Sequence, residues 1–126
     1  MQSTFISQTI TSPEVYYSSF LNKIEIKGRS ITLEGDTFWP KLEEIKTDLK
    51  PQRENFQLHI DLETVNTAGV RNLAKFIHEL KEQLGQSIQV KWFYSLLDLD
   101  LLDTAQCIEK ATGTSFEFIG KTVSLN

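Results

Sequence analysis

Residues 56–84 join a strand pattern to a helix pattern with very little chain between them. Residues 56–63 (Phe-Gln-Leu-His-Ile-Asp-Leu-Glu) alternate between apolar and polar, which is typical of a strand with one buried face. From Ala68 to Leu84 apolar residues recur at helical spacing, and Gly85 favours a helix end. A strand that turns this tightly into a helix favours a domain in which the two kinds of element alternate.

The rest of the chain repeats this alternation. A hairpin is predicted for residues 14–27, and a helix over residues 36–49 that Asp36 or Thr37 caps. A later helix contains Leu101, Ala105 and Ile108 and ends at Gly113. Further strands are predicted at residues 88–94 and 115–119. The order β-β-α-β-α-β-α-β predicts a single α/β domain: a mostly parallel or mixed sheet with an N-terminal hairpin and three packed helices.

The length of 126 residues fits one domain with its own core. We expect residues 1–12 to form a flexible N-terminal arm, residues 13–120 to form the domain, and residues 121–126 to form a C-terminal tail. Unpaired strand edges and the leucine-rich residues 96–102 leave a homodimer open.

Composition narrows the classes of partner. Hydrophobic residues make up 40% of the chain and charged residues 24%, the balance of a soluble globular protein. No apolar run reaches the length of a membrane span, and the first residues lack the basic start and apolar block typical of a signal peptide, so a cytoplasmic location is expected. A net charge of -4 argues against nucleic acid and anionic membranes as partners. The single cysteine, Cys107, fits a reducing compartment and is interpreted as a small core residue.

Motifs for catalysis and metal binding are absent. The chain has no phosphate-binding glycine loop, no dinucleotide fingerprint, no serine nucleophile between glycines and no paired Cys or His ligands. No cofactor is therefore predicted. A small enzyme that uses His59 and Asp61, or the acids Asp98, Asp100 and Asp103, stays as a minor hypothesis, although acids at a helix start more often serve capping.

Asn66 and Thr67 lie where the central helix begins, and two interpretations of them stay open. One of the two caps the helix, which stabilises it by about 1 kcal/mol. Alternatively, Thr67 carries a phosphate, which a helix N-terminus favours by roughly 0.3 to 2 kcal/mol. A partner docked over that turn would meet an unmatched charge, and a penalty of roughly 3 kcal/mol weakens binding about a hundredfold. Leu96, Leu97 and Leu99 form either an apolar docking patch or part of the core.

Two family resemblances bear on this choice. The chain resembles the SiaC family of bacterial regulatory phosphoproteins in Ile26-Lys-Gly-Arg-Ser30, the Asp36-Thr-Phe helix, the strand end Val65-Asn66-Thr67 and Val90-Lys-Trp-Phe-Tyr94. Residues 66–70 (Asn-Thr-Ala-Gly-Val) are also similar to the phosphoacceptor turn of STAS-domain anti-sigma-factor antagonists, and the element order is STAS-like.

The SiaC resemblance implies a non-enzymatic protein whose threonine is phosphorylated by a cognate Ser/Thr kinase and released by a phosphatase. The unmodified form would bind and stimulate a diguanylate cyclase. The phosphorylation site carries over to Thr67, and the partner-binding residues are expected to be Asn66, Thr67, Ala68, Gly69 and Arg71, with Gly69 allowing close approach to the backbone. Ala68-Gly69 stands where the family usually has serines, and an apolar segment follows Tyr94 where the family is usually charged. The STAS resemblance implies an anti-sigma factor with kinase activity as the alternative partner.

Overall fold

The computed structural model describes residues 3–49 and 55–122, which form one sheet with its strands in the order β1-β2-β3-β4-β5-β6. Three α-helices and a short 3-10 helix connect the strands. In chain order the elements are β1 (Ser3–Ile6), β2 (Glu14–Ser18), β3 (Lys23–Ser30), α1 (Phe38–Asp48), β4 (Phe56–Val65), α2 (Thr67–Leu84), η1 (Gly85–Ser87), β5 (Ile88–Ser95), α3 (Leu99–Thr112) and β6 (Phe116–Lys121).

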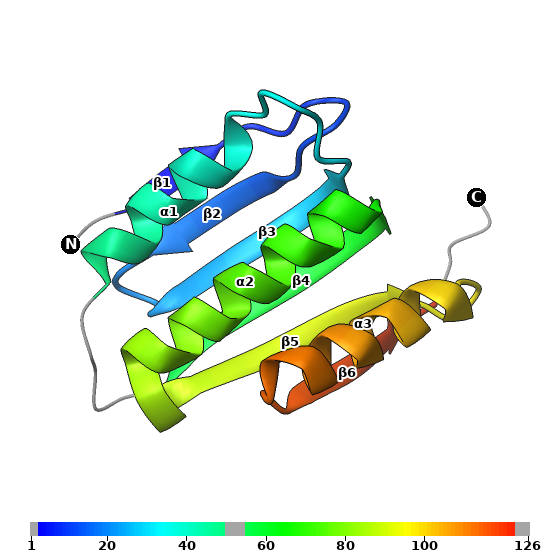
Figure 1. Ribbon diagram of the computed structural model, residues 1–126. Helices are drawn as coiled ribbons and strands as arrows, with labels where there is room; N and C mark the ends of the chain where they lie inside the picture. The colour runs from blue at the N-terminus through cyan, green and yellow to red at the C-terminus, as the bar shows by residue number, and fades with distance from the viewer. Residues whose placement is uncertain (1–2, 50–54, 123–126) are drawn as a thin grey trace.

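The sheet is mixed, as the sequence predicted. β1, β2 and β3 pair antiparallel, and β3, β4, β5 and β6 pair parallel. All three α-helices lie in front of the sheet in Figure 1, because right-handed crossovers between consecutive neighbouring strands place every helix on the same face. The described residues therefore form two layers, and no helix among them covers the second face of the sheet.

Strand β1 was not predicted, and residues 3–6 are not part of a flexible arm. Ser3 lies opposite Ser18 and Ile6 lies opposite Val15 in an antiparallel ladder with β2. The side chain of Ile6 packs against the core. A four-residue strand is too short for its alternation to stand out in the sequence, so the free edge of β2 fixes it rather than its own pattern.

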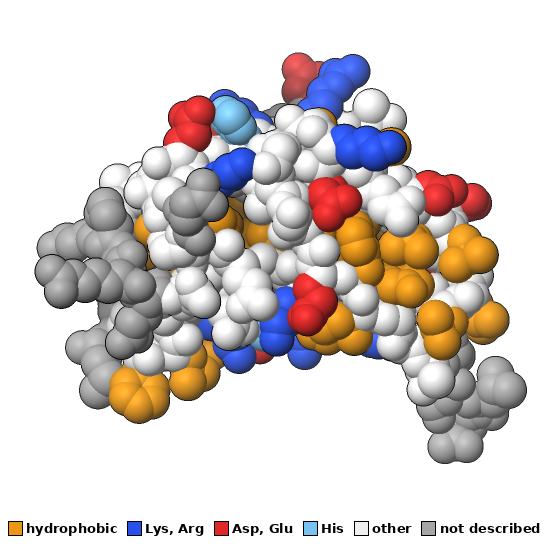
Figure 2. Space-filling model, turned by 90° about the horizontal axis from the view of Figure 1, so that it is seen from below, with side chains coloured by type: hydrophobic (Ala, Val, Ile, Leu, Met, Phe, Trp, Pro, Cys, Tyr) orange, Lys and Arg blue, Asp and Glu red, His pale blue; other side chains and the backbone are white. Residues whose placement is uncertain are grey.

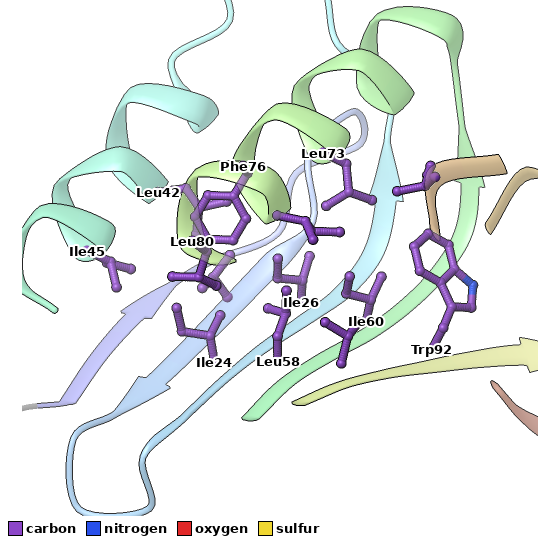
Figure 3. Close-up of a cluster of buried hydrophobic side chains, with 14 of the residues drawn as sticks. Ile24, Ile26, Leu42, Ile45, Leu58, Ile60, Leu73, Phe76, Leu80 and Trp92 are labelled. Carbon is purple, nitrogen blue, oxygen red and sulfur yellow. The ribbon is translucent and has the colours of Figure 1, made fainter. Parts of the chain in front are cut away.

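The core lies between the sheet and the helices, and Figure 3 shows its central part. The predicted inner stripes of α1 and α2 are both buried, including Leu42, Ile45, Leu73 and Leu80. They meet the apolar face of the parallel strands, whose fully buried side chains include Ile24, Ile26, Leu58, Ile60 and Trp92. This layer holds α2 over the central strands, in contact with β4 and β5, so the start of α2 has a fixed position.

Over the parallel strands the uncovered face of the sheet is largely polar, whereas Phe5 and Tyr16 lie opposite each other on β1 and β2 and are exposed. Along β4 the side chains of His59 and Asp61 alternate with the buried Leu58 and Ile60, as predicted. An ion pair of 2.6 Å joins Lys121 Nζ to Asp61 Oδ1 across the strands. Among the described residues, no helix has the length and apolar character needed to cross a bilayer.

Candidate functional site

The carboxyl ends of the four parallel strands meet at one edge of the sheet, which we call the carboxyl edge. The segment 31–37 follows β3 at this edge, Asn66 and Thr67 follow β4, and residues 96–98 follow β5. β4 lies between β3 and β5, so the start of α2 lies between the two other segments (Figure 1). In open α/β sheets, ligands usually bind outside the carboxyl ends of the strands.

Asn66 caps α2 and also ties it to the segment after β3. Its Oδ1 accepts hydrogen bonds from the backbone N–H groups of Gly69 at 2.8 Å and Thr32 at 3.1 Å. Its Nδ2 donates to the carbonyl oxygen of Thr32 at 3.0 Å, and its backbone N–H donates to the carbonyl of Ser30 at 3.1 Å. One amide therefore fixes both the helix start and the neighbouring loop.

Thr67 is the first residue of α2, and its side chain is exposed. Because Asn66 provides the cap, the hydroxyl of Thr67 is not needed for it. Within residues 3–49 and 55–122, no side-chain hydrogen bond uses that hydroxyl. Of the two interpretations left open by the sequence, the capping role belongs to Asn66, and Thr67 presents a free hydroxyl at a helix N-terminus.

Gly69 has an internal role, in contrast to the expected contact with a partner. The residue is buried, and a Cβ built on it would lie 2.5 Å from the carbonyl oxygen of Ser30 and 2.9 Å from Cγ2 of Val65. The missing side chain therefore lets α2 approach the end of β3. Close approach at Gly69 therefore occurs within the chain, and contact of this residue with a partner stays a prediction.

The other two predicted partner-binding residues lie on the first turns of α2. Ala68 is half-buried, and its carbonyl accepts a hydrogen bond from Asn72 Nδ2 at 2.9 Å. Arg71 is exposed and lies four residues after Thr67, so both side chains share one face of the helix. A guanidinium at this spacing can reach an anionic group on residue 67.

Exposed leucines lie on either side of Thr67 along the carboxyl edge. The exposed fraction is 55% for Leu33, 77% for Leu97 and 60% for Leu99. Hydrophobic side chains gather on the right of Figure 2, at the end of the molecule where β5 leads into α3. Of the two interpretations of Leu96, Leu97 and Leu99, exposure favours the docking patch over the core.

The sequence did not identify the Thr32 and Leu33 contributions to this edge. Both belong to the segment between β3 and α1, and neither has a distinctive neighbour in the sequence. Only the pairing of β3 beside β4 brings Thr32 to Asn66, which is thirty-four positions away in the chain. Asn66, directly before Thr67, was the one sequence signal that could have indicated this tie, which we call the Asn66 clamp.

Three of the five alternative catalytic groups, Asp98, Asp61 and His59, make local contacts. The carboxylate of Asp98 caps α3 by accepting a hydrogen bond from the Leu101 N–H at 3.0 Å, as the capping interpretation predicted. Asp61 pairs with Lys121, and His59 Nε2 lies 2.8 Å from Gln57 Oε1. No cluster of three or more metal-ligating His, Cys, Asp or Glu side chains occurs in the part of the chain that the structure describes.

Cys107 is exposed on α3, so its interpretation as a small core residue was wrong. The inner stripe of that helix passes through Leu101, Ala105 and Ile108, and position 107 lies outside it.

The pKa of His59, on the polar face of the sheet, leads to a testable prediction about stability at different pH values. Burial, with smaller contributions from Lys23 and Lys91, holds the pKa of His59 below its ordinary value, against the opposing charges of Glu25 and Glu117. The unfolded chain then binds a proton more readily than the folded chain as the pH falls below about 6.5. We expect His59→Gln to lose less thermal stability than the wild type between about pH 7.5 and 5.5.

Thermal unfolding followed by circular dichroism at the two pH values measures this difference. His78→Gln, which removes the other histidine from the exposed surface of α2, is the matched control. Equal losses of stability in His59→Gln and the wild type would contradict a lowered pKa of His59 in the folded protein.

Comparisons with known proteins agree with this architecture. A sequence model described as SiaC family regulatory phosphoprotein matches residues 6–121. SiaC of Pseudomonas aeruginosa aligns with a TM-score of 0.73 and 17% identity, over 98% of this chain and 100% of that chain. A chain in the crystal structure of the diguanylate cyclase SiaD in complex with its activator SiaC, from the same organism, aligns with a TM-score of 0.75 and 17% identity, over 95% of this chain and 99% of that chain.

These alignments confirm the predicted α/β fold and its family. No curated protein matches the chain. None of the comparisons tests the further likeness to STAS domains, which stays a prediction.

Proposed function

The chain belongs to the SiaC family of regulatory phosphoproteins, and we propose that Thr67 is the residue through which phosphorylation regulates it. A cognate Ser/Thr kinase adds the phosphate and a phosphatase removes it. The protein has no catalytic role of its own in this proposal. It acts by presenting the carboxyl edge to a partner when Thr67 is unmodified.

The observation that carries the proposal is the free hydroxyl of Thr67 beside a cap that does not depend on it. A kinase needs an accessible hydroxyl, and Thr67 is exposed. The fold must also survive the modification. The cap of α2 is made by Asn66, and an anion at a helix N-terminus is stabilised by the helix dipole and the unpaired N–H groups. Phosphate therefore changes the surface while leaving the domain folded.

The partner we propose is a diguanylate cyclase. This choice rests on the similarity to the solved complex of the cyclase SiaD with its activator SiaC. A partner surface that covers Thr67 would meet Leu33 on one side and Leu97 and Leu99 on the other. Exposed Glu34 and Asp100 lie on the same two segments, so the complementary surface is apolar at its centre with basic groups at its rim.

Arg71 gives the switch a second component. In the unmodified protein its exposed guanidinium is available to a partner. After phosphorylation the same group lies one helical turn from the phosphate, and a charge-assisted pair with it removes Arg71 from the docking surface. One modification therefore adds charge and withdraws a contact.

Two measurements test the proposal. Mass spectrometry of the protein isolated from resting and stimulated host cells should find phosphate on Thr67. Co-purification with Thr67→Ala as bait should recover a diguanylate cyclase in both conditions, because this variant cannot be phosphorylated. Thr47→Ala is the matched control, since Thr47 is an exposed threonine in the last turn of α1, at the opposite edge of the sheet from Thr67.

The co-purified protein also separates the alternatives. An anti-sigma factor with kinase activity in place of a cyclase would support the STAS-type antagonist. Absence of phosphate on Thr67 in every condition would overturn the switch. Loss of cellular function on Ala replacement of His59 and Asp61, with Thr67→Ala silent, would favour an enzyme.

The leucines on the carboxyl edge should contribute directly to partner binding. We expect Leu97→Ser to weaken the complex about tenfold, because a largely exposed leucine loses the apolar area that docking would bury. Isothermal titration against the cyclase measures this. Leu21→Ser is the control: Leu21 is 53% exposed but lies in the β2–β3 turn at the opposite edge, and its replacement should leave affinity unchanged.

A further inference from the structure

Strand β6 is an edge strand whose outer side is unpaired among the described residues. It pairs with β5 on one side only. β6 and α3 form the lower border of the molecule in Figure 1, so Figure 2 looks onto them. An exposed strand edge offers its N–H and C=O groups to another strand.

Side-chain and backbone contacts show which residues of β6 direct their backbone groups outward. The Phe116 N–H donates to Glu109 Oε2 at 2.8 Å, so it does not bond to β5. The Lys121 carbonyl accepts from the Leu96 N–H at 3.2 Å, on the β5 side. Backbone groups alternate in direction along a strand, so Phe118 and Gly120 direct their N–H and C=O groups to the free edge.

We infer that β6 pairs antiparallel with β6 of a second copy of this chain, about a two-fold axis at Ile119. Phe118 of each copy then lies opposite Gly120 of the other as a hydrogen-bonded pair. The contact is isologous, which is the commonest form of a closed homodimer. Glu109 already satisfies the N–H of Phe116, which limits the pairing to the second half of the strand.

Charge selects this register over its neighbours. With the axis at Ile119, Glu117 of each copy lies opposite Lys121 of the other, and opposite charges in this position stabilise a sheet. With the axis at Phe118, Glu117 would lie opposite Ile119 of the other copy. With the axis at Gly120, Lys121 would lie opposite Ile119. Moving it to residue 117 places the two Glu117 carboxylates together, which is unfavourable.

The ion pairs within each copy are kept in the proposed β6–β6 contact, which we call the seam, and new ion pairs join them across it. Within one copy, Lys91 Nζ lies 3.9 Å from Glu117 Oε2, and Lys121 Nζ lies 2.6 Å from Asp61 Oδ1. The proposed contact places Glu117 next to Lys121 of the second copy. The result is a row of alternating charge over the polar face of a continuous sheet.

The helix layer is compatible with this pairing. A two-fold axis perpendicular to the sheet leaves both copies of α3 on one face and side by side. Glu109 reaches the outer side of β6, so the side of α3 that carries it faces the seam. At helical spacing that side also carries Leu102 and Gln106, which supply an apolar and a polar group for a helix contact.

Charge reversal tests the register. Sedimentation of the full chain should show a concentration-dependent dimer. Glu117→Lys and Lys121→Glu should each raise its dissociation constant about tenfold, because each places like charges together twice. The double variant restores opposite charges and should return the constant to near the wild-type value. A wild type that stays monomeric to millimolar concentration, or single variants that dimerise unchanged, would overturn the inference.

A cross-link keeps the test independent of folding losses in those variants. Non-hydrogen-bonded antiparallel pairs have Cα atoms about 4.5 Å apart, which a disulfide can span. In a Cys107→Ser background, Ile119→Cys should therefore form a disulfide-linked dimer on mild oxidation. Lys27→Cys, exposed on β3 away from the edge, should not. Equal cross-linking of Ile119→Cys and Lys27→Cys would contradict a contact centred on Ile119. Adding Thr67→Ala to the Ile119→Cys variant should not change the yield of cross-linked dimer.

Discussion

Phosphorylation of Thr67 should weaken binding to the partner cyclase about a hundredfold while the domain stays folded. The phosphate brings roughly two negative charges to the middle of an apolar docking surface. Leu33, Leu97 and Leu99 offer no hydrogen-bond donors to it. Arg71 can match only one of these charges, and the unmatched remainder buried under the partner costs roughly 3 kcal/mol, which corresponds to the hundredfold change.

The fold should tolerate the same modification. Thr67 lies at the N-terminus of an eighteen-residue helix, and its hydroxyl makes no side-chain hydrogen bond in the described part of the chain. The helix dipole and Arg71 both favour an anion at this position. We therefore expect the free energy of unfolding to change by no more than about 2 kcal/mol.

Titration calorimetry with stoichiometrically phosphorylated protein measures the binding, and thermal unfolding measures the fold. Thr67→Ala should bind as tightly as unmodified wild type. Thr67→Glu should give a smaller effect than phosphate because it adds one charge and a different shape. Phosphorylated protein that binds within threefold of the unmodified form would refute a switch at this residue.

The central part of the fold was predictable because its signals are local and strong. The alternation in β4, the helical stripe of α2 and the stop at Gly85 each determine structure within a few residues. Thr67 was predictable as a hydroxyl at a helix start for the same reason. The sequence did not predict that the Thr67 hydroxyl is free of a capping hydrogen bond, because either Asn66 or Thr67 could have been the cap.

Features that depend on neighbours distant in the sequence were missed. Strand β1 exists because β2 offers an open edge, and Gly69 is buried because α2 crosses close to Ser30. Both follow from the order of strands in the sheet rather than from local pattern. Cys107 was placed in the core on the general preference of its residue type, whereas the stripe of α3 places it outside.

The Asn66 clamp was also beyond local pattern, and it leads to a prediction about stability. Asn66→Ala removes a cap worth about 1 kcal/mol and leaves the N–H and C=O of Thr32 without their partners. Each unmade backbone hydrogen bond adds about 1 kcal/mol. We expect a total loss of about 3 kcal/mol in the free energy of unfolding, measured by urea titration.

Asp98→Ala is the matched control for that loss. Asp98 caps α3 through one hydrogen bond from the Leu101 N–H, equivalent to the bond between Asn66 and Gly69. Within the described residues its carboxylate makes no second backbone hydrogen bond of the kind that ties Asn66 to Thr32. Its replacement should cost only about 1 kcal/mol. Asn66→Asp should fall between the two, because it keeps the acceptor and loses the donor to the Thr32 carbonyl. Equal losses in Asn66→Ala and Asp98→Ala would mean that the tie to residue 32 adds no stability, and that the segment carrying Leu33 is positioned beside Thr67 by other contacts.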